Sequence, residues 1–355
     1  MGFKKMDNSI GFADLALKSS MKHNRSLEQM NKLRDAIDWS RVEDILSSHY
    51  QIGTSGEGAD AYPPLILFKC MLLQKWYRIQ SDPELENQIN DRISFKKFLE
   101  LSLDSPSPDH STFSRFRTRL SKNAMDQVNS EILRQFEAQG LTINEGVAVD
   151  ARLVKSASHP ISNDKIKELK EKHNTPEGKL DKKGNLKKFT RDLESDWTIK
   201  NDIPHYGLKE HASVDTKHGF ILATTMSPAS VHDTNFLQYC TVYSRHTQQK
   251  IEKVYADKGY FGEPNRQFLS LNKIADGIMR KDTTTAKLTE FEINRNKNIS
   301  KVRYIVEQYF GVSHLHDDAK KARFTTIAKN KFDCWCRQTA YNISKGLKIL
   351  KVATV

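Results

Sequence analysis

The chain has 355 residues, which is long enough for two domains that each bury a hydrophobic core. Its 56 lysine and arginine residues outnumber 44 aspartate and glutamate residues, and the resulting formal charge of +12 favours a polyanionic partner such as nucleic acid. A hydrophobic content of 37% argues against an intrinsically disordered chain.

Cysteine usage and hydropathy exclude two further classes. The four cysteines are too few and too scattered for a disulfide framework or a zinc cage, so we expect a reducing cytoplasm. The most apolar stretch, residues 63–79, is interrupted by Lys69, Lys75 and Arg78. We therefore expect neither a membrane span nor a signal peptide.

The amino-terminal part of the chain reads as a polar arm followed by a helical domain. Residues 1–45 are polar with scattered apolar positions, and we expect little stable helix in this arm. Apolar residues at three- and four-residue spacing then predict helices over 63–79, 83–101 and 125–139. These helices place an all-helical domain at residues 46–140.

One further helix in this domain, predicted over residues 111–122, is strongly basic. Arg115, Arg117 and Arg119 alternate along it, and Asp109 can cap its start. Such a helix could enter a major groove of DNA, where arginine reads guanine and holds phosphates. The alternative is an ordinary solvated basic face.

The pattern changes at Glu145, after which short β-branched runs begin. Strands are predicted over 146–154, 211–215, 219–226 and 253–257, followed by helices over 301–311 and 330–350. We therefore expect an α/β domain over residues 141–355, with a mixed sheet flanked by helices. Residues 156–200 are dense in charge and poor in large apolar side chains, which indicates a surface insertion.

Three aspartates follow apolar strand residues, namely Asp150, Asp215 and Asp257. We expect them at strand ends, and open α/β sheets gather their ligands at the carboxyl edge of the sheet. Each aspartate taken alone could instead cap a turn. Asp215 fits that alternative best, because the Asp-Thr-Lys-His-Gly sequence after the strand looks like a hairpin turn.

Glu307 is the best candidate for a third carboxylate. It lies on an apolar helical stretch four residues after Arg303, so the two side chains can stack as an ordinary surface ion pair. A buried carboxylate would need a cation beside it, which could be Arg303 or a metal ion. Three converging carboxylates suit Mg²⁺ or Mn²⁺, and two such ions about 4 Å apart perform phosphodiester chemistry.

Histidines offer an alternative metal set. His205, His211, His218 and His232 surround the second group of strands, and an HxH motif occurs at residues 314–316. No HExxH motif or paired CxxC accompanies them, which favours scattered surface or supporting histidines over a zinc or iron centre.

Taken in order, these segments resemble the DDE transposases of bacterial insertion sequences, particularly the group typified by insertion sequence five. The likeness covers roughly residues 50–350. It rests on the fragments AYPPLILFKCMLLQKWY, LENQINDRISFKKFLEL, PDHSTFSRFRTRL, VDARLV, HYGLKEHASVD, SPASVHDTNF, YADKGY and VRYIVEQYFG.

The resemblance implies a ribonuclease-H-like catalytic domain over residues 141–355, preceded by a helix-turn-helix-like DNA-binding domain. Its catalytic and metal-binding residues would be Asp150 on the central strand, Asp257 at a neighbouring strand end and Glu307 on a helix packed against the sheet. The expected cofactor is Mg²⁺, with Mn²⁺ as a substitute, and two ions are expected.

The family's Tyr-Arg-Glu-Lys signature is only partly kept. Arg303 stands four residues before the glutamate as expected, whereas Ser300 replaces the tyrosine and His314 replaces the lysine. The DNA-binding residues that the resemblance adds outside the helical domain are Arg303, His314, Lys320 and Lys321. His232 and Asp233 match a motif near the site and are expected to support it.

The implied function is that of a transposase which binds the terminal inverted repeats of its insertion sequence. It would cleave DNA strands with the help of metal and transfer the freed 3′-OH end into target DNA. Its partners would be double-stranded DNA and at least a second copy of the chain, in the nucleoid of a bacterial cytoplasm. Two alternatives are a metal-dependent endonuclease without strand transfer and a catalytically silent DNA-binding protein.

Overall fold

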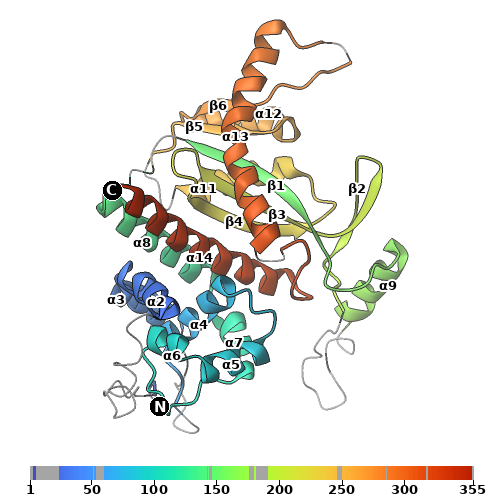
Figure 1. The fold of residues 1–355 in the computed structure, drawn as a ribbon. Helices are drawn as coiled ribbons and strands as arrows, with labels where there is room; N and C mark the ends of the chain where they lie inside the picture. Colours follow the sequence, from blue (N-terminus) through green and yellow to red (C-terminus); the bar gives the residue numbers. More distant parts are fainter. Residues whose placement is uncertain are drawn as a thin grey trace. The chain divides into compact units, whose positions relative to one another are not determined.

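The computed structural model describes residues 3–4, 24–50, 52, 60–141, 143, 146–175, 180, 191–245, 250–284, 286–316 and 319–353. The chain forms two compact units (Figure 1). The first unit contains Met1–Thr142 and Trp335–Val355, and the second contains Ile143–Cys334. The last 21 residues, which the sequence places in the catalytic domain, therefore group with the helical unit instead.

The regular elements in the described part of the first unit are helices, beside one isolated β-bridge between Phe3 and Ala61. Its helices are α2 (Arg25–Asp35), α3 (Trp39–His49), α4 (Pro64–Trp76), α5 (Asp82–Asp91), α6 (Ile93–Leu99), α7 (His110–Arg119), α8 (Lys122–Ala138) and the later part of α14 (Ile327–Ala353). Helix α4 is buried around almost its whole circumference, as its apolar sequence predicts. The helix expected over 83–101 is broken at Arg92, whose extended backbone separates α5 from α6.

Helices α2 and α3 occupy the segment for which the sequence predicts little stable helix. Asn24 and Asp38 cap their first turns with side-chain oxygens, and Leu27, Met30 and Leu33 bury one face of α2. The expectation of an arm is therefore wrong for residues 24–45. Short, polar helices of this kind gain most of their stability from tertiary packing, which local periodicity underestimates.

A buried ion pair fastens α7 inside the helical unit. Both terminal nitrogens of Arg117 donate to the carboxylate of Asp82, and one of them also reaches Gln74 on α4. The Arg117 side chain is 2% exposed. The prediction that Arg117 reads DNA is therefore wrong, because the helix turns this arginine inward, whereas Arg115 and Arg119 remain exposed.

The second unit is built on a mixed six-stranded sheet. Its strands are β1 (Val147–Lys155), β2 (Asp196–Lys200), β3 (Ile203–Asp215), β4 (Ile221–Pro228), β5 (Lys253–Ala256) and β6 (Ala275–Ile278). The order is β2-β3-β1-β5-β6, and β4 pairs with β3. The central strand β1 runs antiparallel to β3 and parallel to β5, so the expectation of a mixed sheet is confirmed.

Helices flank this sheet. They are α9 (Asn163–Asn174), α11 (Leu237–Ser244), α12 (Glu263–Leu271), α13 (Glu290–His316) and the first part of α14. The long helix α13 packs on β1, β5 and β3, as Figure 1 shows. No helix in the described part of the chain has the length and apolarity needed to cross a membrane.

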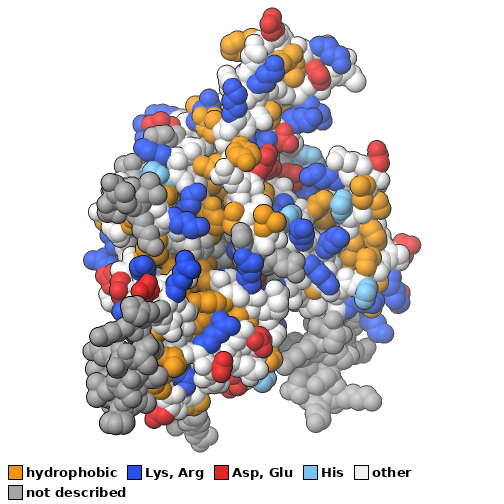
Figure 2. All heavy atoms as spheres, viewed as in Figure 1, with side chains coloured by type: hydrophobic (Ala, Val, Ile, Leu, Met, Phe, Trp, Pro, Cys, Tyr) orange, Lys and Arg blue, Asp and Glu red, His pale blue; other side chains and the backbone are white. Residues whose placement is uncertain are grey.

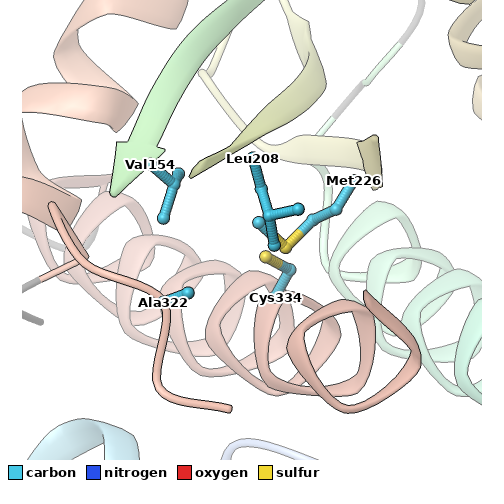
Figure 3. Close-up of a cluster of buried hydrophobic side chains, with 5 residues drawn as sticks. All are labelled: Val154, Leu208, Met226, Ala322 and Cys334. Atoms are coloured by element: carbon cyan, nitrogen blue, oxygen red, sulfur yellow. The ribbon is translucent and has the colours of Figure 1, made fainter. Parts of the chain in front are cut away.

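A small apolar cluster closes one end of the sheet (Figure 3). Val154, Leu208 and Met226 come from β1, β3 and β4, and they meet Ala322 and Cys334. All four cysteines are buried. The charged segment 156–200 contributes α9 and β2, whereas residues 176–179 and 181–190 of the predicted insertion lie outside the described residues.

Replacing Asp82 by alanine should destabilise the helical unit by about 3 kcal/mol, because the substitution leaves the Arg117 guanidinium buried without its carboxylate. Urea unfolding measures the difference. Asp35→Ala is the matched control, since Asp35 pairs with Arg34 at the surface with a 64% exposed side chain, and it should change the free energy of unfolding by less than about 1 kcal/mol. Equal effects of the two substitutions would contradict the structural role of Asp82.

Candidate active site

Asp150 projects from the middle of the central strand. It is the fourth residue of β1, so the prediction that it ends a strand is wrong: the strand continues for five more residues to Lys155. Its Oδ1 accepts a hydrogen bond from the amide of Ala151 at 2.8 Å. Its Oδ2 accepts from a terminal nitrogen of Arg303 at 2.7 Å.

Asp257 directly follows β5, the parallel neighbour of β1. Its Oδ1 accepts from the amide of Lys258 at 2.6 Å and caps the short 3-10 helix Lys258–Tyr260. A nitrogen of Arg303 lies 4.0 Å from the same oxygen. The strand end that the sequence predicts for Asp257 is therefore present, and the two aspartates face one guanidinium.

The charges of Asp150 and Asp257 explain why Arg303 lies between them. Burial raises the pKa of Asp150, and the nearby negative charge of Asp257 raises this pKa further. Arg303 and the amide of Ala151 act in the opposite direction. The Arg303 side chain is only 8% exposed, so its charge acts in a poorly hydrated place.

Glu307 stands one helical turn after Arg303 on α13, and it is exposed. The carboxylates that contact Arg303 in the described part of the chain are the two aspartates rather than Glu307. Nor do any three His, Cys, Asp or Glu side chains among the described residues gather closely enough to hold a metal ion. The structure thus brings two of the three predicted carboxylates together.

The donor chemistry of the site nevertheless fits a hard divalent cation. Asp150 and Asp257 present oxygen atoms to one shared position, which is the type of ligand that Mg²⁺ and Mn²⁺ prefer. The same position accepts a positive charge, since a guanidinium occupies it. Asp150 and Asp257 could therefore hold an ion, with Glu307 as the nearest acidic side chain along α13 to add.

A second group of charged side chains lies between the sheet and α13, and the sequence did not predict it. Arg152 and Glu210 form a buried ion pair between β1 and β3, where they are directly opposite in register. The hydroxyl of Tyr309 on α13 donates to Glu210 at 2.6 Å. One sequence feature could have indicated this ion pair: Arg152 comes two residues after Asp150, so both side chains lie on the same face of the strand.

The segment with His232 and Asp233 supports the turn that carries Asp257. His232 is exposed, and its Nδ1 caps the short 3-10 helix Asp233–Phe236. Asp233 pairs with Lys209 at 2.9 Å. The hydroxyl of Thr234 donates to the carbonyl oxygen of Gly259 at 2.9 Å, inside the turn after Asp257. This contact is made by Thr234, and the supporting role expected of His232 and Asp233 stays a prediction.

The histidine alternative finds no support in the described residues. His211 is buried, stacks on Phe236 with ring centroids 3.8 Å apart, and lies 2.9 Å from the hydroxyl of Ser227. Burial lowers the pKa of His211 to about 3, so the imidazole is neutral at ordinary pH. It is a core residue of the sheet.

The other basic residues predicted to bind DNA differ in exposure. Lys320 and Lys321 are exposed, and the main chain beside them pairs with Lys155 at the end of β1. His314 is half-buried near the carboxyl end of α13, whereas Ser300 is exposed near its middle. Their contacts with DNA stay predictions.

Replacing Arg303 by methionine should raise the pKa of Asp150, because the burial that raises it then acts without the offsetting cation. A carboxyl that binds its proton more tightly in the folded state loses stability as pH rises above the unfolded pKa of about 4. We therefore expect the variant to lose more stability than the wild type between pH 4 and pH 7 in urea unfolding. Arg303→Lys should restore most of the difference, and identical pH profiles would contradict this account.

Replacing Tyr309 by phenylalanine should cost about 2 kcal/mol, because Glu210 loses a hydrogen bond in a buried, charged environment. Tyr304→Phe on the same helix is the matched control, since Tyr304 is 59% exposed, and it should cost less than about 0.5 kcal/mol. Thermal unfolding measures both variants. A Tyr309→Phe protein as stable as the control would show that the hydroxyl does not fasten α13.

Two family models match the chain. Residues 16–119 match the model described as Transposase domain (DUF772). Residues 143–343, more than half of the chain, match the model described as Transposase DDE domain. No solved structure matches the chain. The second match covers β1, β5, all of α13 and most of α14, and the chain therefore belongs to the DDE transposases of insertion sequences.

Proposed function

We propose that the protein binds the terminal inverted repeats of its insertion sequence, cleaves DNA strands there and transfers the 3′-OH ends into target DNA. The observation that carries this proposal is the convergence of Asp150 and Asp257 on Arg303. Carboxylates from two parallel strands meet a helix that also bears Glu307, inside the segment that matches the DDE domain. The mixed strand order supports a ribonuclease-H-like fold, and the fragments quoted above support the group typified by insertion sequence five.

Asp150, Asp257 and Glu307 are the proposed catalytic and metal-binding residues. DDE transposase domains generally use divalent metal ions, and two Mg²⁺ or Mn²⁺ ions would supply activation of the attacking oxygen and stabilisation of the leaving oxygen. Arg303 keeps the two aspartates together until that positive charge is supplied. Its guanidinium also has the geometry to pair with a phosphate of the substrate.

The exposure of Glu307 gives its side chain room to move. It lies one turn from Arg303, on the same side of α13. We propose that Glu307 turns toward the two aspartates when DNA binds. The hydrogen bond from Tyr309 to Glu210 holds the backbone of α13 against the sheet, so the movement is confined to the side chain.

The DNA-binding part of the proposal combines both units. Arg115 and Arg119 are exposed on α7, in a helical unit proposed to be helix-turn-helix-like. Lys320 and Lys321 are exposed in the catalytic unit, where His314 takes the place of the signature lysine. Because an element has two ends, we propose that at least two copies of the chain act together.

Asp257→Asn should lower the rate of strand cleavage in Mg²⁺ by about a thousandfold or more, because removing a metal-holding charge forfeits several kcal/mol of transition-state stabilisation. Binding to the element's ends, measured in a gel-shift assay, should stay nearly unchanged. Asp202→Asn is the control, since Asp202 is exposed in the β2–β3 turn with φ +60°, which asparagine also accepts. Cleavage that survives in Asp257→Asn would refute the assignment.

Joining of labelled element ends to target DNA distinguishes the proposed function from its alternatives. The wild-type protein should produce joined products in Mg²⁺ or Mn²⁺. Cleaved ends without joined products would identify an endonuclease. Binding without cleavage in either metal would identify a catalytically silent DNA-binding protein.

A further inference from the structure

Three arginines surround a single aspartate at the edge of the sheet. Asp276 on β6 has carboxylate oxygens 3.2 Å from Arg280, 3.6 Å from Arg295 and 4.0 Å from Arg266. All four side chains are between 21% and 34% exposed. The cluster thus has a surplus of positive charge at a place that solvent and a ligand can reach.

The three arginines are not equivalent. Arg295 has a structural task, since its terminal nitrogens donate to the carbonyl oxygens of Asp276 at 2.7 Å and Ile278 at 2.8 Å. Arg266 lies over the ring of Phe261, 4.4 Å from the centroid, and Arg280 lies 6.0 Å from the same centroid. Buried nitrogens of these two arginines, Nε of Arg266 and one terminal nitrogen of Arg280, have no hydrogen-bond partner among the described residues.

The charge of the cluster is incompletely compensated. Burial lowers the pKa of Arg295, and the positive charges of Arg280 and Arg266 lower it further, whereas Asp276 and Glu292 raise it. Glu292 is already engaged, because its carboxylate accepts hydrogen bonds from the amide and hydroxyl of Thr289. An anion placed beside Arg266 and Arg280 would relieve this repulsion.

The cluster borders the proposed active site on two sides. Phe261 directly follows the short 3-10 helix that Asp257 caps. Arg280 directly follows Met279, whose sulfur lies 3.8 Å from a nitrogen of Arg303. Phe261 is thus four residues from Asp257, and Arg280 is one residue from a contact of Arg303. Figure 2 shows lysine and arginine side chains on the protruding part of the molecule that contains the start of α13.

We propose that Arg266 and Arg280, with the ring of Phe261 beside them, bind a backbone phosphate of DNA that flanks the scissile phosphate. The inference rests on the proposed function, since the DNA strand must lie at Asp150 and Asp257 for its next phosphates to meet this cluster. Arginine suits the task because its planar fork pairs with two phosphate oxygens at once. The contact is independent of base sequence, so it positions the strand rather than selecting it.

The test measures the binding of an element-end duplex by fluorescence anisotropy over a range of salt concentrations, without added metal. Arg280→Gln should weaken binding about tenfold at low salt and reduce the slope of log K against log salt by about one, because one phosphate contact is lost. Arg266→Gln should have a similar effect. Arg134→Gln is the matched control, since Arg134 is an exposed arginine of α8 with its own partner, Glu131, at 2.6 Å.

Asp276→Asn tests the same site in the opposite direction. The asparagine oxygen can still accept the hydrogen bond that the amide of Ile278 donates to Asp276 at 2.8 Å, while one negative charge is removed. If a phosphate binds here, the duplex should bind several-fold more tightly and with a steeper salt slope. A cluster with only a structural role would instead give a lower melting temperature and unchanged affinity.

The outcomes separate this inference from the proposed function. If Arg280→Gln, Arg266→Gln and Asp276→Asn all bind the duplex like Arg134→Gln while the wild type cleaves and joins ends, the phosphate site is wrong and the transposase function stands. If the wild type neither binds nor cleaves the duplex, both fail. A reduced salt slope in the two arginine variants, with folded proteins by circular dichroism, supports the site.

Discussion

The Arg303 guanidinium balances two carboxylates that arrive from different strands, and the catalytic unit depends on this contact. Val149 on β1 and Ala256 on β5 are partners in the parallel register, so the next residue on each strand is an aspartate. Asp150 and Asp257 are therefore brought together by strand pairing itself. Two like charges close together repel each other, and Asp150 is poorly hydrated with a 19% exposed side chain, whereas Asp257 is 42% exposed. A cation has to come from a helix laid across the sheet.

Helix α13 supplies this cation through Arg303, and a second buried polar contact, made by Tyr309, holds the same helix against the sheet. Side chains two residues apart share a strand face, so Asp150 and Arg152 both point toward the helix. Arg303 pairs with the first of them, and Tyr309 reaches the second through Glu210. The two contacts are six residues apart on the helix, or about 9 Å at 1.5 Å per residue. Two polar anchors at this separation resist sliding of the helix, because either shift would leave a buried charge without its partner.

The sequence predicts β1, β4 and β5 and parts of β3, α13 and α14, because their signals are local, whereas β2, β6, α11 and α12 were not predicted. Alternating and β-branched runs mark β1, β3, β4 and β5, and the apolar periodicity of 301–311 marks α13. Asp215 also behaves as its local sequence predicts, since its carboxylate accepts from the amide of His218 at 2.6 Å in the hairpin turn. The spacing of Asp150, Asp257 and Glu307 rests on the resemblance to a family, and the structure contributes the contact between the two aspartates and Arg303.

What the sequence could not predict depends on partners that are distant along the chain. Arg117 looks like its exposed neighbours Arg115 and Arg119, and only the position of Asp82, 35 residues earlier, turns it into a core residue. Glu210 is one of many acidic residues until strand register sets it opposite Arg152. The helices that begin before residue 46 were not predicted for the same reason, because their apolar faces are stabilised by the rest of the helical unit. The burial and the partners of charged residues are thus the features that local sequence predicts least well.

The position of Glu307 outside the aspartate pair follows from the same electrostatics. Asp150 already has a raised pKa from burial and from the charge of Asp257, and Arg303 offsets part of this rise. A third carboxylate at the same place would add repulsion that one guanidinium cannot balance. Gathering all three is therefore favourable only when further positive charge arrives. Under the proposed function, the complete acidic site would therefore cost free energy in the free protein, and its assembly would be coupled to the binding of cations and of the DNA strand.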